Sequence, residues 1–177
     1  SAASDVYKRQ TVMRTFLMAM LGTLMLFTQA HIASAQEPMM TLLSKDAPAQ
    51  VVQAEAEALK VMHDFMRTFN SRDPEAFADT LTYPHVRIAS GGVTVFPDRQ
   101  SFIDGTDFAA FAKRCNWAHS QWDSSKTVQA DTKKIHFAVQ FTRFNPQGEP
   151  YISFNSLYIV VRIDAGWGIR ARSSFAP

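Results

Sequence analysis

The order of hydrophobic patterns along the chain predicts an α+β domain in which helices come first and long strands follow. Between Gln50 and Phe69, apolar residues recur at steps of three, four and seven, which is the period of one helix face. After Pro84, apolar and polar residues alternate, and this strand period continues in long segments to Phe175. We expect residues 50–177 to form one domain with about three N-terminal helices.

Residues 13–35 have the pattern of a secretory signal peptide. Arg14 precedes an apolar run that ends near Phe27, and Ala33-Ser34-Ala35 is the small-residue pattern that signal peptidase recognises. We therefore expect cleavage before Gln36 and a periplasmic or secreted product. The run is shorter than the about 20 apolar residues that cross a bilayer, so no membrane span is expected after cleavage. Residues 1–12 are interpreted as an upstream, non-native or untranslated-region segment, and residues 36–49 as a flexible tether.

The composition of residues 36–177 argues against a nucleic-acid partner, an intramolecular disulfide and a metal site. The chain has 18 Lys and Arg against 16 Asp and Glu, and residues 1–35 contain three of the basic and one of the acidic residues, which leaves 15 of each. A nucleic-acid partner requires a concentrated basic surface, so we expect none. Cys115 is the single cysteine, so no intramolecular disulfide can form. No metal site is expected, because the histidines have no close paired spacing: His63, His85, His119 and His136. No cofactor is expected either, and the sequence has no Gly-rich phosphate loop.

Three helices are predicted. The first has an apolar stripe consisting of Val52, Leu59, Met62, Met66 and Phe69, and His63 lies at its margin as a core or boundary residue. Asp73 can cap a second, short helix that begins with Pro74, and Pro84 is expected to close that helix. The third covers residues 107–116, and its inner face carries Phe108, Phe111, Ala112 and an inert Cys115 thiol.

The strands are predicted from period-two alternation and turn residues. Gly91-Gly92 indicates a tight hairpin, and four longer strands are expected within residues 122–130, 133–144, 150–163 and 166–175. In the second of these, the buried face consists of Ile135, Phe137, Val139 and Phe141. The third is apolar on both faces, which favours a central strand that is covered on both sides, for example by a second subunit. Arg170 and Arg172 are expected to share a face opposite Ile169.

This order of elements resembles the NTF2-like superfamily, which includes SnoaL-like proteins, steroid isomerases and many exported proteins. The resemblance is carried by "FMRTFNSRDPEAFADTLTYPHVRIASG" and "GWGIRARSSF", and it spans about residues 51–175. It implies a curved, mostly antiparallel sheet that wraps around the helices, a cone-shaped cavity open at one end, and frequent homodimers through the sheet face.

The resemblance also allows a test of steroid-isomerase chemistry. Those enzymes use a carboxylate base, a tyrosine and a neutral acid. Matching the motifs puts Phe65 at the tyrosine position, Ala89 at the position of the base and approximately Ser156 at that of the second acid. Since neither Phe65 nor Ala89 can perform the matching role, we do not expect steroid isomerisation.

His85 and Arg87 are two positions apart, so they share one face of their strand. They could bind an anionic ligand, with Arg87 as a fork for a carboxylate and His85 as a proton donor. The alternative places Val86 and Ile88 against the helices and leaves both polar residues in solvent, and this interpretation is favoured because alternating strands usually behave so. Tyr83 could line the rim of the cavity or pack against a capped turn.

The segment "NWAHSQWD" places Trp117, His119 and Trp122 between the last helix and the sheet. Aromatic walls with one titratable group are typical of a site for a small hydrophobic ligand. The alternative is that both tryptophans fill the core and His119 caps a helix end, and buried tryptophan is the commoner case.

Three functions remain open. The first is an exported domain that binds a small, mostly apolar molecule in its cavity, with the ligand-binding candidates Tyr83, Arg87, Trp117, Trp122, Asn155 and Tyr158. The second is a SnoaL-like lyase, isomerase or hydrolase that uses His85 or His119 as its acid-base group and Arg87 or Tyr158 to hold an oxyanion. The third is an interaction module that forms a homodimer through the sheet face around residues 151–161.

Overall fold

The computed structural model describes residues 47–177, so the predicted signal peptide, the predicted upstream segment and most of the predicted tether lie outside the described residues. Helices and strands follow in the order α2 (Ala49–Ser71), α3 (Pro74–Ala78), β1 (Leu81–Ala89), β2 (Gly92–Phe96), α4 (Arg99–Asp104), α5 (Phe108–Cys115), β3 (His119–Ala130), β4 (Lys134–Phe144), β5 (Pro150–Ile163) and β6 (Gly166–Ser174). Within this part of the chain, no helix combines the length and hydropathy that a membrane span requires.

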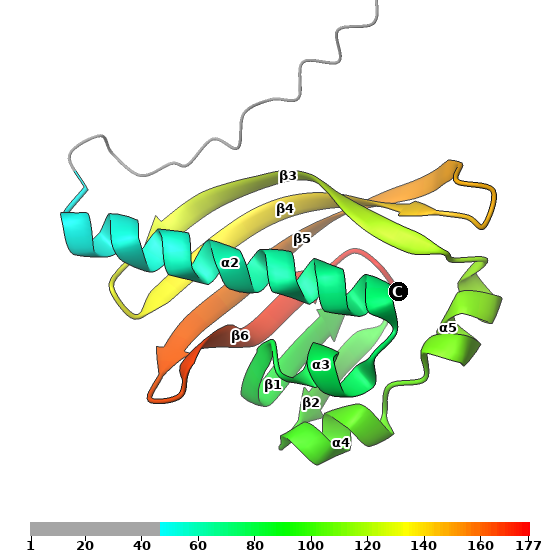
Figure 1. Ribbon diagram of the computed structural model, residues 1–177, viewed down its shortest axis with the longest axis horizontal. Helices are drawn as coiled ribbons and strands as arrows, with labels where there is room; N and C mark the ends of the chain where they lie inside the picture. Colours follow the sequence, from blue (N-terminus) through cyan, green and yellow to red (C-terminus); the bar gives the residue numbers. More distant parts are fainter. Residues whose placement is uncertain (1–46) are drawn as a thin grey trace, which may run out of the picture. The chain divides into compact units, whose positions relative to one another are not determined.

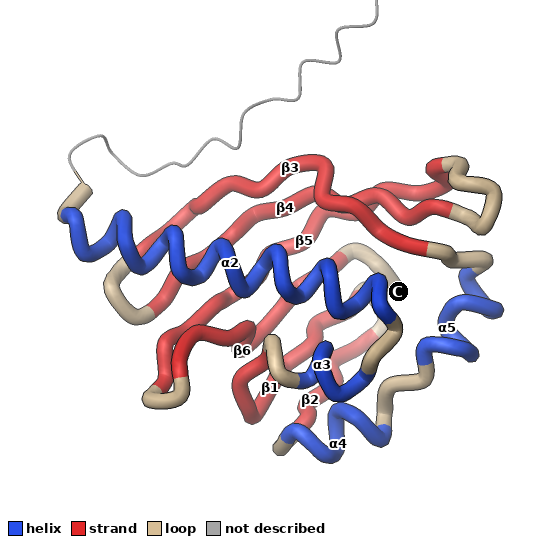
Figure 2. The backbone as a smooth tube through the Cα atoms, in the orientation of Figure 1, coloured by secondary structure: helices blue, strands red, loops and turns tan. Residues whose placement is uncertain are grey.

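The six strands form one curved sheet in the order β2-β1-β6-β5-β4-β3, and the long helix α2 crosses one of its faces (Figure 1). All neighbouring strands are antiparallel except β1 and β6, which run parallel. The helices α3 and α4 lie at the β1–β2 end of the sheet, and α5 leads into β3 (Figure 2). The prediction of helices followed by a mostly antiparallel sheet is therefore confirmed.

The long helix packs on the sheet through a stripe that begins with small side chains. Ala54 and Ala58 are 3% and 0% exposed, and the stripe continues through Met62, Phe65 and Met66. Val52, which we predicted in this stripe, is 50% exposed. At about 100° per residue, Val52 lies roughly 80° around the helix from Met62, so its side chain points away from the sheet.

The short helix α3 begins as its sequence predicts. The Asp73 carboxylate accepts hydrogen bonds from the main-chain N–H groups of Glu75 and Ala76, and Pro74 occupies the first helical position. The prediction that Pro84 closes this helix was wrong, because α3 ends at Ala78 and Pro84 lies inside β1.

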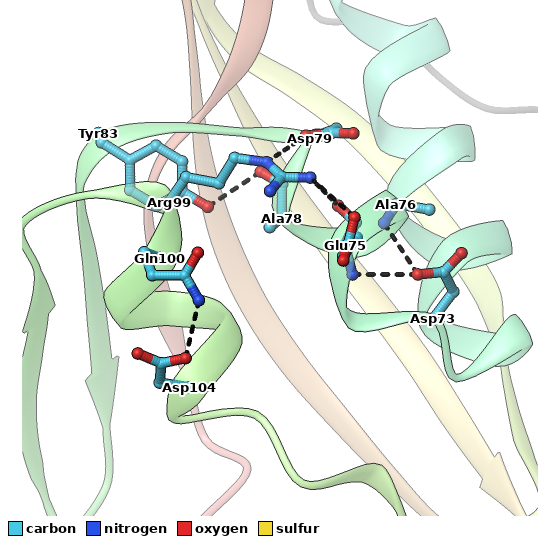
Figure 3. A network of polar contacts seen from close by, with 9 residues as sticks. All are labelled: Asp73, Glu75, Ala76, Ala78, Asp79, Tyr83, Arg99, Gln100 and Asp104. Carbon is cyan, nitrogen blue, oxygen red and sulfur yellow. Dashed lines mark hydrogen bonds and ion pairs between the residues drawn. The ribbon is translucent and has the colours of Figure 1, made fainter.

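The helix α4 was not predicted. Its N-terminus is fixed by a capping box, in which the Asp98 carboxylate accepts from the Ser101 main-chain N–H and the Ser101 hydroxyl lies 3.3 Å from the Asp98 nitrogen. Arg99 ties α4 to the end of α3, because its Nε donates to Asp79 at 2.7 Å and its Nη2 lies 3.8 Å from the Glu75 carboxylate (Figure 3). Helix α4 thereby covers the β1–β2 end of the sheet with Phe102, which is 4% exposed.

The long strands β3–β6 and their turns are close to the prediction. The predicted inner face of β4 is buried, with Ile135, Phe137, Val139 and Phe141 between 0% and 8% exposed. On β5, Tyr158 and Val160 face the same core, whereas Leu157 on the other face is 37% exposed. In a single chain, the outer face of β5 is therefore open rather than covered.

A β-bulge in β6 changes which residues face the core. Ile169 pairs with Val160 and Ala171 pairs with Ile159, so Arg170 has no partner on β5. Ile169 and Arg172 consequently lie on the same, helix-covered side, and Arg172 pairs with the buried Tyr158. Our expectation that Arg172 lies opposite Ile169 was wrong because period-two counting does not anticipate the extra residue.

Candidate functional site

A cavity of about 300 Å³ lies between the helices and the inner face of the sheet. We call it the aromatic cavity, because ten of its 22 lining residues carry aromatic rings: Phe65, Phe69, Phe77, Phe96, Phe102, Phe108, Phe111, Trp122, Phe141 and Tyr158. These residues come from α2, α3, β2, α4, α5 and β3–β5, so every layer of the fold contributes to the wall. Four of the other lining residues are arginines: Arg87, Arg114, Arg143 and Arg172.

The rings of the wall hold one another in place. Tyr158 contacts Phe65 and Trp122 edge-on, with centroid separations of 5.4 Å and 5.6 Å. The Trp122 indole N–H donates to the main-chain oxygen of Met62 at 3.2 Å, which fixes this ring to α2. These contacts fix the rings of Tyr158 and Trp122 against α2.

Three arginines project into the aromatic cavity from the sheet. Arg87 of β1 and Arg172 of β6 are register partners on adjacent parallel strands. The Arg172 guanidinium carbon lies 5.5 Å from the ring centre of Phe65. Arg143 of β4 is 7% exposed, and its guanidinium carbon lies 5.0 Å from the ring centres of both Phe111 and Phe154.

These arginines have no acidic partner. Between residues 47 and 177, the ion pairs of arginine with Asp or Glu involve Arg67 and Arg99. The Nε atoms of Arg143 and Arg172 are buried without a hydrogen-bond partner. Burial lowers the pKa of Arg87, and the nearby charges of Arg172 and Arg143 lower it further. Burial also lowers the pKa of Arg143. The aromatic cavity thus contains a concentration of uncompensated positive charge.

Two charged residues of the cavity lining, Asp107 and Arg87, already have hydrogen-bond partners within the chain. Asp107 is the one Asp or Glu residue in the lining, and its side chain already caps α5 by accepting from the Ala110 N–H at 2.8 Å. Arg87 donates from Nη2 to the main-chain oxygen of Pro177 at 2.6 Å. Arg87 therefore already binds an oxygen acceptor, whereas the Nε groups of Arg143 and Arg172 do not.

His85 is buried, which corrects the favoured interpretation of the His85–Arg87 pair. Its ring is 1% exposed and packs against Phe96 and Phe102, while Ile88, expected against the helices, is 43% exposed. The reason is the unpredicted helix α4, which covers this face of β1 with Phe102. The His85 Nδ1 lies 3.0 Å from the Ile169 main-chain oxygen, and Nε2 has no partner. Burial, reinforced by Arg172, lowers the pKa of His85 to about 4, so the ring is neutral near pH 7.

The structure brings three of the predicted ligand-binding residues into the wall of the aromatic cavity: Arg87, Trp122 and Tyr158. Tyr83 packs against the capped turn, where its hydroxyl donates to the Ala78 oxygen at 3.0 Å. Trp117 is 1% exposed in the core, and its N–H donates to Ser120 Oγ. Asn155 lies in a shallow hollow on the outer face of the sheet.

Neither histidine proposed as an acid-base group belongs to the cavity lining. His85 lies behind the wall, and His119 stacks on Phe144 with a centroid separation of 4.6 Å. His63, expected at the core boundary, is exposed on α2. In residues 47–177, no three His, Cys, Asp or Glu side chains gather so that they could hold a metal ion.

Sequence reasoning missed Arg143 and Arg172 as cavity residues. Arg143 continues the parity of the buried face of β4, since it lies two residues after Phe141, and this signal could have identified it. Arg172 had no such signal, because the bulge at Arg170 shifts the parity of β6.

Comparison with family models matches residues 54–174 to the family described as NTF2-like protein (DUF6841). The chain belongs to this family. The resemblance inferred from the sequence motifs is thereby confirmed, and the curved sheet with its helices is the NTF2-like cone. Comparison with curated proteins finds no match.

Solved structures share this NTF2-like fold at low identity. An NTF2-like protein with a cystatin-like fold from Novosphingobium aromaticivorans is 13% identical, with a TM-score of 0.60 over 71% of this chain and 82% of that one. The protein Aln2 from a Streptomyces species is 18% identical, with a TM-score of 0.56 over 70% and 91%. A protein from Catenulispora acidiphila in complex with S-DNPA is 14% identical, with a TM-score of 0.56 over 70% and 93%. At these identities the likeness shows the fold alone.

Proposed function

We propose that this NTF2-like domain binds a small, mostly apolar molecule in the aromatic cavity. The observation that carries the proposal is the cavity of about 300 Å³, lined by ring side chains from eight elements of the fold. Ligand sites in proteins are concave, largely apolar and preformed, with a few polar groups that orient the ligand. The aromatic cavity has each of these properties.

The wall favours a flat molecule. Tyr158 meets Phe65 and Trp122 edge-on, whereas Phe65 and Trp122 are stacked with a centroid separation of 6.4 Å, and such a wall presents ring faces and edges to an aromatic or alicyclic guest. A volume of about 300 Å³ lies at the lower end of the usual range for small-molecule sites, which suits a body of one or two fused rings.

Thermal unfolding with a set of one-ring and two-ring compounds tests this proposal. Compounds that bind the folded state should raise the melting temperature as the ligand concentration increases, and Trp122→Ala should remove this rise. Trp167→Ala is the matched control, because Trp167 is half-buried and donates its N–H to Glu57, outside the cavity. A ligand that still raises the melting temperature of Trp122→Ala as strongly as that of the Trp167→Ala protein would place binding elsewhere.

The proposal includes no reaction. A general acid or base has to reach the reacting atoms, and His85 and His119 both lie outside the lining. Arg87, Arg143, Arg172 and Tyr158 can hold a ligand or an oxyanion, but arginine does not exchange protons near neutral pH. Binding is therefore the function that the geometry supports best.

Two further parts of the proposal rest on the sequence and on the outer face of the sheet. Residues 13–35 support export, which predicts a mature protein that begins at Gln36 when the periplasmic or secreted fraction is analysed by mass spectrometry. Leu157 and Phe175 are 37% and 75% exposed on the outer side of the sheet, which supports a homodimer through this face. Leu157→Lys should then lower the mass measured by light scattering from that of a dimer to that of a monomer.

A further inference from the structure

The polar part of the aromatic cavity specifies the chemistry of its ligand. Arg87, Arg143, Arg172 and Arg114 contribute to the lining, and Asp107 is the one Asp or Glu residue there. Asp107 is already engaged as the cap of α5. A cation would be repelled by this lining, and a neutral guest would leave the positive charges uncompensated. An anion is the guest that the charges favour.

The arrangement of Arg87 and Arg172 supports the same conclusion. They are direct register partners on β1 and β6, and like charges in such positions repel each other. Neither is paired with an Asp or Glu among residues 47–177. A carboxylate placed between the two guanidinium groups would convert this repulsion into two charge-assisted hydrogen bonds.

Arg143 provides a second, independent observation. Its side chain is 7% exposed, and its Nε is buried without a partner although the residue belongs to the cavity lining. The rings of Phe111 and Phe154 hold its guanidinium carbon at 5.0 Å, so the group is fixed in position before any ligand arrives. A buried donor that is held in place and unsatisfied indicates an acceptor that is supplied from outside.

We propose that the ligand is a small organic acid with an aromatic body, whose rings lie against Phe65, Trp122 and Tyr158 and whose carboxylate is bound by Arg172 together with Arg87 and Arg143. This inference rests on the proposed function, since it names the ligand class of the same cavity. The guanidinium fork matches a carboxylate in geometry as well as in charge. The oxygen of Pro177 at 2.6 Å from Arg87 is an acceptor of the kind that the ligand would supply.

Isothermal titration with three related probes tests the inference: 2-naphthoate, 2-naphthamide and 2-naphthyl phosphate. The acid and the amide have nearly the same shape, so their difference in affinity reports the charge. We expect 2-naphthoate to bind at least about tenfold more tightly than 2-naphthamide, because hydrogen bonds to charged groups are that much stronger than neutral ones. This comparison uses the unmodified protein and depends on no variant.

Variants then locate the carboxylate. Arg172→Met and Arg143→Met should each weaken 2-naphthoate about tenfold and change 2-naphthamide by less than about twofold. Arg170→Met is the matched control, because Arg170 is a half-buried arginine of the same strand whose Nε donates to Thr82 outside the lining. It should leave both affinities unchanged. If circular dichroism shows that a variant is unfolded, the comparison of 2-naphthoate with 2-naphthamide on the unmodified protein still tests whether the cavity prefers an anion.

The outcomes separate the two proposals. Equal binding of the amide and the acid would overturn the organic-acid inference and leave the apolar-ligand proposal standing. Tighter binding of 2-naphthyl phosphate than of 2-naphthoate would overturn the assignment to a carboxylate. Binding by none of the three probes would count against both proposals.

Discussion

Replacing Arg172 with methionine should make the ligand-free domain more stable, although most substitutions of buried residues destabilise. The Nε of Arg172 is buried without a partner, an arrangement that costs about 1–3 kcal/mol. Repulsion from its register partner Arg87 adds roughly 0.2–1 kcal/mol. Against these stands the contact with the Phe65 ring at 5.5 Å, which contributes about 0.5–1 kcal/mol.

The net gain expected for Arg172→Met is therefore about 2 kcal/mol in the free energy of unfolding, or roughly 6–10 °C in the melting temperature of a domain of this size. Methionine is unbranched and can fill the space of the arginine stem. Urea unfolding at low salt, followed by tryptophan fluorescence, measures the change. The control Arg170→Met should instead lose stability, because Arg170 donates to Thr82 at 2.9 Å.

A double-mutant cycle with Arg87→Met isolates the repulsion. The two substitutions should be less stabilising together than the sum of the single changes, since either one already removes the like-charge pair. The coupling should shrink as salt is added. A loss of about 1 kcal/mol or more in ligand-free Arg172→Met would show that the guanidinium is well satisfied without a ligand, and the reasoning on the charge of the cavity would fail.

Three more predictions concern other parts of the fold. Burial lowers the pKa of His85 from 6.5 to about 4. Between these two pH values the unfolded state binds more protons than the folded state, so the free energy of unfolding falls by up to about 3 kcal/mol as the pH drops from 6.5 to about 4. Urea unfolding at neutral pH and near pH 4 should show a smaller fall for His85→Asn, and an unchanged fall would exclude His85 as the group responsible. Arg99→Met should release α4 from α3 (Figure 3), which hydrogen exchange would detect as faster exchange of α4 amides, with little change in global stability because exposed ion pairs contribute little. Gly168→Ala would place a Cβ 2.7 Å from Thr82 Cγ2 and 3.1 Å from the Leu81 carbonyl carbon. We therefore expect thermal unfolding to show a loss of at least about 2 kcal/mol in the free energy of unfolding. An unchanged stability would contradict the close approach of β1 and β6 at this residue.

Local signals in the sequence predicted much of the fold. The period of residues 50–69, the Asp73-Pro74 start of α3 and the parity of β4 each depend on neighbours in the chain, so they could be read without a structure. Helix α4 has only six residues, too few for a period to emerge, although Asp98 and Ser101 have the spacing of a capping box.

The candidate site was less predictable because it depends on which face each strand presents to the helices. The orientation of His85 and Arg87 is decided by α4, which covers β1 from a later position in the sequence. The orientation of Arg172 is decided by one unpaired residue in β6. Of the two arginines that sequence reasoning missed, Arg143 could have been assigned to the buried face from the alternation of β4. That its Nε has no hydrogen-bond partner is seen only in the folded structure.

The bulge at Arg170 makes the chemistry of the cavity depend on strand pairing as much as on residue type. If β6 paired regularly with β5 beyond Ile169, Ala171 would lie opposite Tyr158, and Arg172 would lie opposite Leu157 on the outer face. The same amino acids would then give the cavity a methyl group in place of a guanidinium. The charge of this cavity can therefore differ between related chains that have identical wall residues, if the bulge in β6 is present in one chain and absent in the other.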